Sequence, residues 1–329
     1  MFSSKIIAVV GATGAQGSSV VKTFLTLPGW TVRSITRSPS SDKAKELASL
    51  GSEVVQADLS DPESLARAFE GAAAIFVNTD FWEEYHSLVA AGKDTETAGK
   101  IAYDTELQNA KNAAIAASNV STLERYIYSA LTPLKTYSKG KYSHAQHFES
   151  KAAAVNYIES DLTELAKKTS FIYVGIYNNN LFLFPQRDLK TGKFTLVLPG
   201  PKKTQLLIID ANNSVGLYVR ALIEDEEPGL KLLAYDTDIT AGDVVEAWSR
   251  VTGEDAEFIE MSVKDMHEIL KIPLEYLDAA GFLAEFSYAA GLDVITPDQL
   301  KTKVNTESYQ EFLEAKGKEA LLKNEVVKV

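Results

Sequence analysis

Three glycines near the start of the chain, Gly11, Gly14 and Gly17, have the spacing of a phosphate-binding turn. They follow an apolar run from Ile6 to Val10, which predicts a buried strand, and precede an apolar segment of helical spacing at 20–25. Glycine there permits a tight turn, close approach of a pyrophosphate to the backbone, and packing of the helix on the sheet. The helix N-terminus then offers free N–H groups to the phosphates. The G-x-x-G-x-x-G spacing is a variant of the G-x-G-x-x-G fingerprint and predicts dinucleotide binding. The alternative is a turn that binds nothing.

The turn itself supplies the candidate phosphate ligands. They are Gly11, Thr13, Gly14, Ala15, Gln16 and Gly17.

A basic residue, Arg37, ends the next predicted strand, Trp30 to Thr36. About 20 residues past the glycines, an Asp or Glu holds the ribose 2′-hydroxyl of NAD, whereas an Arg accommodates the 2′-phosphate of NADP. No acidic residue occurs between Gly17 and Asp42, so we expect NADP(H) as the cofactor. The alternative is that Arg37 is a solvated charge at a strand end. Further phosphate contacts are expected from Arg33, Ser38 and Lys43.

Two residues follow the third predicted strand, Glu53 to Ala57, at the edge where open α/β sheets bind ligands. Asp58 and Leu59 are therefore candidates for the adenine pocket. Asp58 could equally begin the turn into the helix that starts near Pro62.

The fourth predicted strand, Ala73 to Val77, is followed by small polar residues and then by two aromatic ones. Asn78 and Thr79 are candidates for the nicotinamide-ribose or substrate wall. Phe81 and Trp82 could extend that wall or pack in the core. A polar loop is expected from Glu83 to about Lys93, before a long helix from about Thr97 to Ser118.

The segment after the fifth predicted strand, Arg125 to Ser129, bears on catalysis. Short-chain dehydrogenases, which the glycine pattern resembles, use a Tyr-x-x-x-Lys pair on one helix face, with Tyr as general acid and Lys holding the ribose. Tyr137 and Lys141 have this spacing in loop-like surroundings. The better helix, Ala145 to Tyr157, carries Lys151 with His147 four residues before it. It therefore keeps the cofactor-holding lysine, and His147 stands where the tyrosine is usual.

Two further candidates follow the sixth predicted strand, Phe171 to Ile176. Tyr177 and Asn180 could bridge cofactor and substrate, and Tyr177 is a second candidate proton donor. An asparagine-rich stretch is also typical of an ordinary turn.

The alternation of strands and helices in the first half predicts an α/β fold with a doubly wound parallel sheet. We expect a dinucleotide-binding domain over 1–180 and a smaller α/β C-terminal lobe for substrate or partner over 181–329, with a soft boundary that the chain can cross. A helix is expected from Leu274 to Tyr288, with Phe282, Phe286 and Tyr288 facing either the cleft or the core. A charged, mostly solvated helix is expected over 307–329.

Composition narrows the function classes. The 329 residues are 45% hydrophobic and 24% charged, with no apolar run long enough for a membrane helix, so we expect a soluble cytoplasmic protein, with the nucleus as a second compartment. The absence of cysteine removes disulfides and thiolate chemistry. A net charge of −12 argues against direct nucleic-acid binding. Four histidines without metal-type spacing predict no metal site.

The first half of the chain resembles the NmrA-like family, an atypical branch of the short-chain dehydrogenase/reductase superfamily. The resemblance rests on VVGATGAQGSSVV, the ITR that ends at Arg37, VVQADLSD, IFVNTDFWE and HFESKAAAVNY. It implies a Rossmann-type domain with a smaller lobe, NADP(H) at the glycine loop, the 2′-phosphate at Arg37 and the ribose at Lys151. Thr79 is a softer correspondence. This branch often lacks the catalytic tyrosine, so His147 fits its pattern.

Two functions follow from these residues and this resemblance. The first, slightly favoured by the missing tyrosine, is a redox-sensing regulator that responds to the NADPH/NADP⁺ ratio, with a protein partner such as a transcription regulator. The second is an NADPH-dependent reductase of a small carbonyl or conjugated double bond. In the reductase, Lys151 holds the cofactor and His147, Tyr177 or the Tyr137 loop supplies a proton.

Overall fold

A parallel sheet of seven strands forms the centre of the molecule. The computed structural model describes residues 4–188 and 191–324, and the sheet order is β11-β6-β5-β4-β1-β2-β3. Its strands are β1 (Lys5–Val10), β2 (Trp30–Thr36), β3 (Glu53–Gln56), β4 (Ala72–Val77), β5 (Arg125–Ala130), β6 (Thr169–Val174) and β11 (Lys231–Ala234). Every residue of β4 and β6 is buried, which suits the continuous apolar run of β4 and the mainly apolar sequence of β6. The strand order reverses between β1 and β4, the position where open parallel sheets bind ligands.

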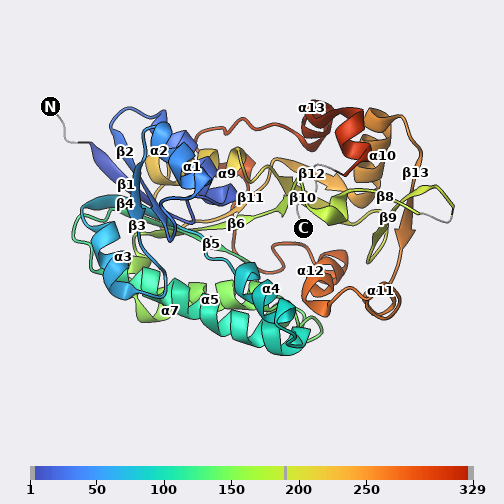
Figure 1. Ribbon diagram of the computed structural model, residues 1–329, viewed down its shortest axis with the longest axis horizontal. Helices are drawn as coiled ribbons and strands as arrows, with labels where there is room; N and C mark the ends of the chain where they lie inside the picture. Colours follow the sequence, from blue (N-terminus) through green and yellow to red (C-terminus); the bar gives the residue numbers. More distant parts are fainter. Residues whose placement is uncertain (1–3, 189–190, 325–329) are drawn as a thin grey trace.

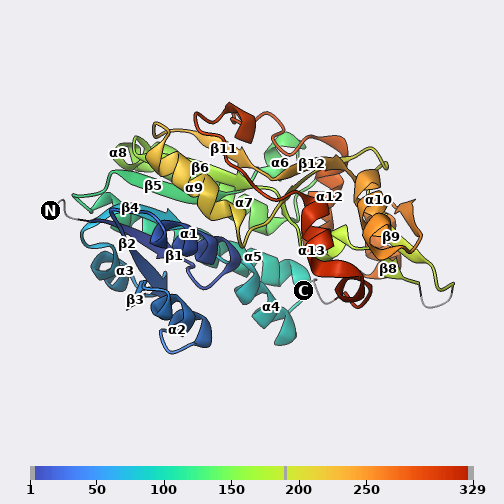
Figure 2. The same cartoon turned by 90° about the horizontal axis from the view of Figure 1, so that it is seen from above.

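Helices cover both faces of this sheet, so the predicted doubly wound fold is confirmed (Figures 1 and 2). One face carries α1 (Ala15–Leu25), α2 (Asp42–Ser49) and α9 (Ser214–Glu224), and the other carries α3 (Pro62–Phe69), α5 (Thr95–Ser118) and α7 (Gln146–Asp161). Short helices α6 (Leu134–Tyr137) and α8 (Thr163–Ala166) flank α7. Over the described ranges, no helix is both long and apolar enough to cross a membrane.

Local signals explain where several helices begin. The Ser41 side chain accepts a hydrogen bond from Ala44 N and so caps α2, as its sequence predicts. Asp61 caps α3 in the same way, with Pro62 in the first turn. Strand β11 lies at one edge of the sheet, comes from residues beyond 180 and pairs in parallel with β6.

A smaller lobe with its own core lies beyond one end of the sheet, on the right of Figure 1. It contains two three-stranded sheets, ordered β12-β10-β7 and β13-β9-β8. Their strands are β7 (Ile176–Tyr177), β8 (Gln186–Arg187), β9 (Phe194–Leu198), β10 (Gln205–Ile209), β12 (Thr237–Thr240) and β13 (Ala256–Glu260). The accompanying helices are α10 (Ala241–Thr252), α11 (Val263–Leu270), α12 (Leu274–Glu285) and α13 (Tyr309–Leu322).

The prediction of a polar loop over residues 83–93 is wrong, because a helix, α4 (Trp82–Ala90), occupies most of this segment. Asp80 Oδ1 accepts hydrogen bonds from Trp82 N at 2.9 Å and from Glu83 N at 3.4 Å. Two glutamates in the first turn also suit the positive end of the helix dipole. The acidic residues that made the segment look like a loop therefore stabilise the start of a helix.

The C-terminal segment is more buried than expected. Tyr309, Phe312, Leu313 and Leu321 of α13 pack against α10 in the core of the lobe, and residues 325–329 lie outside the described residues. The helix expected to reach Tyr288 ends at Glu285. Strand β6 ends at Val174, because Gly175 lies against β10: a Cβ on Gly175 would be 2.4 Å from Leu207 O.

Candidate functional site

A cavity of about 990 Å³ opens at the carboxyl ends of β1 to β4 and extends beneath the lobe. We call the part lined by residues 10–87 its glycine side and the part lined by residues from 131 onward its lobe side. Its volume is at the upper end of the range for small-molecule sites. One cavity therefore joins the predicted dinucleotide turn to the predicted catalytic helix.

Nearly all of the predicted site residues line this cavity. They are Gly11, Thr13, Gly14, Ala15, Gln16, Arg37, Asp58, Leu59, Asn78, Thr79, His147, Lys151, Tyr177 and Asn180. Gly17 lies behind the turn and does not line it. Of the three aromatic residues near the end of α12, Tyr288 lines the cavity, whereas Phe282 is fully buried against Tyr142 and Phe286.

The glycine turn has the tight backbone that its sequence predicts. Gly11 has φ +74°, and a Cβ on Gly17 would lie 2.1 Å from Gly11 O. No side chain caps α1, whose N-cap is Gly14, so its first N–H groups face the cavity without a side-chain acceptor. The buried Oε1 of Gln16 also has no partner within the described part of the chain, while its Nε2 donates to Tyr177 OH at 2.7 Å. These open donors and this open acceptor fit the pyrophosphate and nicotinamide parts of a dinucleotide.

Arg37 is paired with an acidic residue that sequence analysis did not assign to the site. Its Nη2 lies 2.5 Å from Glu83 Oε2, and both side chains are more than half exposed. The hydrogen bond that Arg37 donates to Glu83 raises the pKa of Arg37, with further contributions from the charges of Asp58 and Asp80. The predicted 2′-phosphate site therefore carries three nearby carboxylates. The pairing of Arg37 with Glu83 could not be predicted, because the segment of Glu83 was expected to be a loop.

Asp58 has both roles that its sequence suggested. Its Oδ1 accepts hydrogen bonds from Ser60 N at 2.8 Å and Ser60 Oγ at 2.7 Å, so it begins the turn into α3. The backbone N–H of Ser60 is the main cause that lowers the pKa of Asp58. The residue also lines the cavity beside Leu59.

Lys151 is held in a buried polar network at the junction of the two sides. Its Nζ donates to Thr79 Oγ1 at 3.0 Å, to Thr79 O at 3.1 Å and to Asn78 Oδ1 at 3.1 Å. Glu106 of α5, which is 1% exposed, lies 3.3 Å from the same Nζ. Its carboxylate also accepts from Thr79 Oγ1 at 2.7 Å and from Ser150 Oγ. Lysine, asparagine and threonine are thus preorganised at the place where a nicotinamide ribose is expected.

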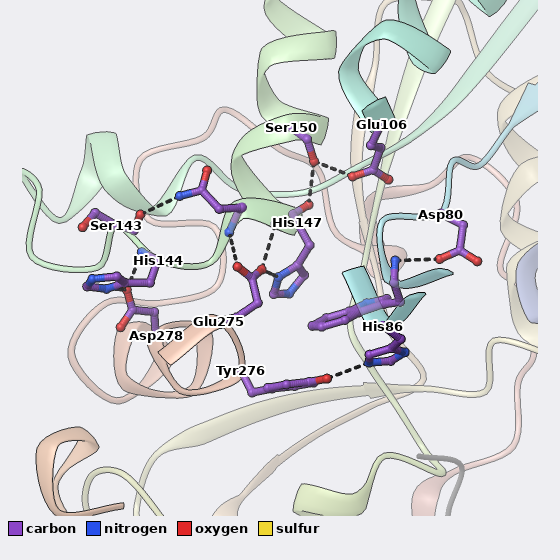
Figure 3. A network of polar contacts seen from close by, with 12 residues as sticks. Asp80, His86, Glu106, Ser143, His144, His147, Ser150, Glu275, Tyr276 and Asp278 are labelled. Atoms are coloured by element: carbon purple, nitrogen blue, oxygen red, sulfur yellow. Dashed lines mark hydrogen bonds and ion pairs between the residues drawn. The ribbon is translucent and has the colours of Figure 1, made fainter. Parts of the chain in front are cut away.

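His147 is paired with a second residue that sequence analysis missed, Glu275 in the first turn of α12 (Figure 3). Its Nδ1 lies 2.5 Å from Glu275 Oε1, which also accepts His147 N at 3.1 Å. The other carboxylate oxygen, Oε2, accepts Gln146 N at 3.1 Å. Glu275 thus satisfies open N–H groups at the start of α7 and fixes the imidazole. The pair is separated by 128 residues in the chain, so no local spacing could reveal it.

Aromatic side chains also pack against the His147 ring. Trp82 lies 4.6 Å from it, centroid to centroid, and stacks on Tyr276 at 4.7 Å. Tyr276 OH is in turn 2.7 Å from His86 Nε2, as Figure 3 shows. The Phe81–Trp82 pair that follows β4 therefore packs around the candidate catalytic histidine.

A second histidine–carboxylate pair lies three residues away from the first along both chain segments. His144 Nδ1 is 3.0 Å from Asp278 Oδ2, which also accepts His144 N at 2.7 Å. The His144 side chain is 49% exposed and does not line the cavity. The same two chain segments, around the starts of α7 and α12, thus carry one histidine inside the cavity and one outside it.

The two tyrosines considered as proton donors differ in position. Tyr177 lines the cavity, and burial is the main cause that raises its pKa. Tyr137 ends the short helix α6 and does not line the cavity, while the chain turns at Lys139 with φ +54°. Tyr137 and Lys141 therefore do not share one helix face.

Comparison with known proteins places the chain in a family. The model of the NmrA-like family matches residues 3–313. The NmrA-like family domain-containing oxidoreductase cpsB of Aspergillus campestris is 28% identical over 278 residues, which cover 80% of this chain and 78% of that protein. The oxidoreductase notA' of Aspergillus versicolor, described in the same words, is 36% identical over 143 residues, covering 42% of this chain and 35% of that protein.

Solved structures with low sequence identity share the fold. A crystal structure of NmrA, described as a negative transcriptional regulator, has a TM-score of 0.72 at 23% identity and covers 94% of this chain and 95% of that one. The NADPH-dependent quinone oxidoreductase QOR2 of Escherichia coli, solved with NADPH, has a TM-score of 0.68 at 19% identity, with 94% and 99% covered. At such identities the likeness concerns the fold.

Proposed function

The chain belongs to the NmrA-like family, and from this premise we propose that it is an NADP(H)-dependent reductase. The cofactor would lie on the glycine side of the cavity. A small organic substrate with a carbonyl or conjugated double bond would lie on the lobe side, next to His147 and Lys151.

One observation carries this proposal: a single cavity joins an open phosphate-binding turn to a histidine–carboxylate pair and an apolar compartment. A protein that only senses a dinucleotide needs the glycine side and the junction at Lys151. The lobe side adds space and an ionisable group that such a sensor does not use. This is why the reductase is preferred here to the redox-sensing regulator, the slightly favoured expectation from sequence. The names of the curated relatives, which are oxidoreductases, agree with this preference.

The residues of the glycine side would hold and orient the cofactor. The turn and the first N–H groups of α1 receive the pyrophosphate, and Arg37 receives the 2′-phosphate. Lys151 and Asn78 lie where they can bind the nicotinamide ribose, and the buried Glu106 keeps the lysine in place. When bound, NADPH supplies a hydride to the substrate.

Calorimetric titration with NADPH, NADP⁺, NADH and NAD⁺ tests the cofactor assignment. Wild type should bind the phosphorylated pair more tightly, and Arg37→Ala should lose about 10- to 100-fold in NADPH affinity while keeping its NADH affinity, because two charge-assisted hydrogen bonds are lost. Lys45→Ala is the control, since Lys45 is exposed nearby and does not line the cavity. If none of the four dinucleotides binds, the proposal is wrong.

A further inference from the structure

The lobe side of the cavity has features that a cofactor site does not require, and they identify a proton donor and a substrate class. We infer that His147, positioned by Glu275, protonates the substrate through its Nε2, and that the substrate is an uncharged, apolar carbonyl or imine compound. This inference rests on the proposed function, because the hydride must come from bound NADPH.

The hydrogen bonds of Glu275 determine which nitrogen of His147 is available. Both carboxylate oxygens accept backbone N–H groups, from residues 146 and 147, so the side chain acts as a hydrogen-bond acceptor. Nδ1 at 2.5 Å therefore carries a hydrogen and donates it to Glu275. Nε2 has no hydrogen-bond partner among the residues that the structure describes, and His147 lines the cavity. Only Nε2 is left to meet a ligand.

The rings around His147 suit a protonated imidazole. The ring centroid of Trp82 lies 4.6 Å from that of the histidine, and aromatic rings attract nearby cations. Tyr276 stacks on Trp82 and is tied to His86, which limits movement of the wall. Glu275, with 4% of its side chain exposed, compensates the positive charge of an imidazolium at close range.

Several titratable groups lie in the wall around His147. From α12 these are Glu275 and Tyr276, and from α4 they are Tyr85 and His86, of which neither lines the cavity. One turn further along α7, Lys151 is neutralised by the buried Glu106. Glu275 is thus the one carboxylate that contacts the imidazole within the described residues.

The lining of the lobe side indicates the substrate class. From residue 131 onward, the described lining residues include no Asp, Glu or Arg, and the only lysine is Lys151, which is already paired. The wall is formed mainly by Phe148, Phe182, Leu183, Leu198, Leu206 and Leu283. A charged substrate would lose its hydration there, and the cations of this lining, Lys151 and a protonated His147, are already compensated by Glu106 and Glu275, so its binding is unfavourable. An apolar molecule with one hydrogen-bond acceptor fits this lining.

The reaction balances with these groups. The carbon of the C=O or C=N bond accepts a hydride from NADPH, and NADPH is thereby oxidised to NADP⁺. The electron pair of the broken π bond moves to the oxygen or nitrogen, and that atom takes the proton from His147 Nε2. The product is an alcohol or amine, and the neutral imidazole regains a proton from solvent.

Matched variants of the two histidine pairs test the proton donor. With saturating NADPH and 2-naphthaldehyde as probe, His147→Gln should lower kcat by about 100-fold or more with little change in KM, because general acid catalysis is lost. His144→Gln should leave kcat within about 2-fold, since an exposed histidine outside the cavity takes no part in proton transfer. The pH profile of kcat should differ between wild type and His147→Gln, because the variant has no group at this position that can donate a proton.

Glu275 is a positioning residue, and its test uses the same comparison. Glu275→Gln removes the charge and keeps one acceptor oxygen, which can still accept the N–H groups of His147, so kcat should fall by roughly 10-fold or more with KM unchanged. Asp278→Asn, the matched change at the outer pair, should not alter kcat. If His147→Gln does not fold, His147→Asn and Glu275→Gln decide the question. An unchanged kcat in a folded variant of either residue overturns the proton-donor role.

Binding to the NADP⁺ complex tests the substrate class without turnover. 2-Naphthaldehyde should bind roughly 10-fold or more tightly than 6-formyl-2-naphthoate, which differs by one carboxylate. Equal binding of the two, or no binding of either, overturns the substrate class, and binding without any turnover overturns the proton-donor role. A failure of the proposed function is distinguishable, because in that case NADPH and NADP⁺ themselves do not bind.

Discussion

The two sides of the cavity are built differently. The glycine side comes from consecutive strand ends within the first 87 residues, and its charged groups, Arg37 and Glu83, are exposed. The lobe side is assembled from α7, α12 and the lobe strands, and its lining residues Lys151 and His147 are each paired with a buried glutamate, Glu106 and Glu275. The first arrangement suits binding of a charged, exchangeable cofactor, and the second suits a fixed chemical group in an apolar site. We therefore assign cofactor binding to the glycine side and chemistry to the lobe side.

The glycine side should be sensitive to backbone crowding. In Gly17→Ala the new Cβ would lie 2.1 Å from Gly11 O, so the turn must shift, and we expect NADPH affinity to fall by about 100-fold or more. Calorimetry measures this loss. Gly14→Ala, whose Cβ would lie 3.3 Å from the same oxygen, should lose less. Wild-type affinity in Gly17→Ala would contradict the assignment of this turn to the phosphates.

The junction between the two sides should depend on a buried charge. Glu106→Gln leaves Lys151 buried without its countercharge, and the free energy of unfolding should fall by about 3–5 kcal/mol. Urea unfolding without cofactor measures this change. The control is Lys100→Gln on the same helix, where the Glu96–Lys100 pair is exposed and no change is expected. If Glu106→Gln is as stable as wild type, the network does not hold Lys151.

The smallest effect should come from the exposed pair on the glycine side. In Glu83→Gln, Arg37 no longer has a competing carboxylate, so NADPH affinity should rise by about 2- to 5-fold, as expected for an exposed ion pair. NADH affinity should stay the same, because NADH has no 2′-phosphate. Glu84→Gln in the same helical turn is the control, as titration with both dinucleotides should show no gain. A lower NADPH affinity in Glu83→Gln would mean that Glu83 helps to bind the cofactor.

Sequence could predict some parts of the site better than others, and the difference again separates local features from long-range packing. The strands that carry the glycine side, and the positions of Arg37, Asn78 and Thr79 at their ends, follow from local apolar runs and turn residues. Lys151 and His147 were placed on a helix by their spacing. Because parallel strands end at one edge, these residues could be expected together before any contact was known.

The partners of these residues could not be predicted, because long-range packing determines them. Glu275 and Tyr276 reach His147 only when α12 folds back across the start of α7. Glu106 is one of three carboxylates on a long alanine-rich helix, and only its burial shows that it pairs with Lys151. Helix α4 was expected to be a loop because its first-turn acids were interpreted as solvent-exposed loop residues. The missed partners of His147 and Lys151 concern contacts between distant segments, whereas the missed helix α4 begins with a local cap by Asp80.

Single-turnover kinetics of His147→Gln tests the division between binding and chemistry most directly. The variant is saturated with NADPH, mixed rapidly with 2-naphthaldehyde, and followed by the decay of NADPH absorbance. We predict a hydride-transfer rate about 100-fold or more below wild type, with the Kd for NADPH unchanged within about 2-fold. A wild-type rate, or a loss of NADPH affinity that accounts for the slower reaction, would contradict it.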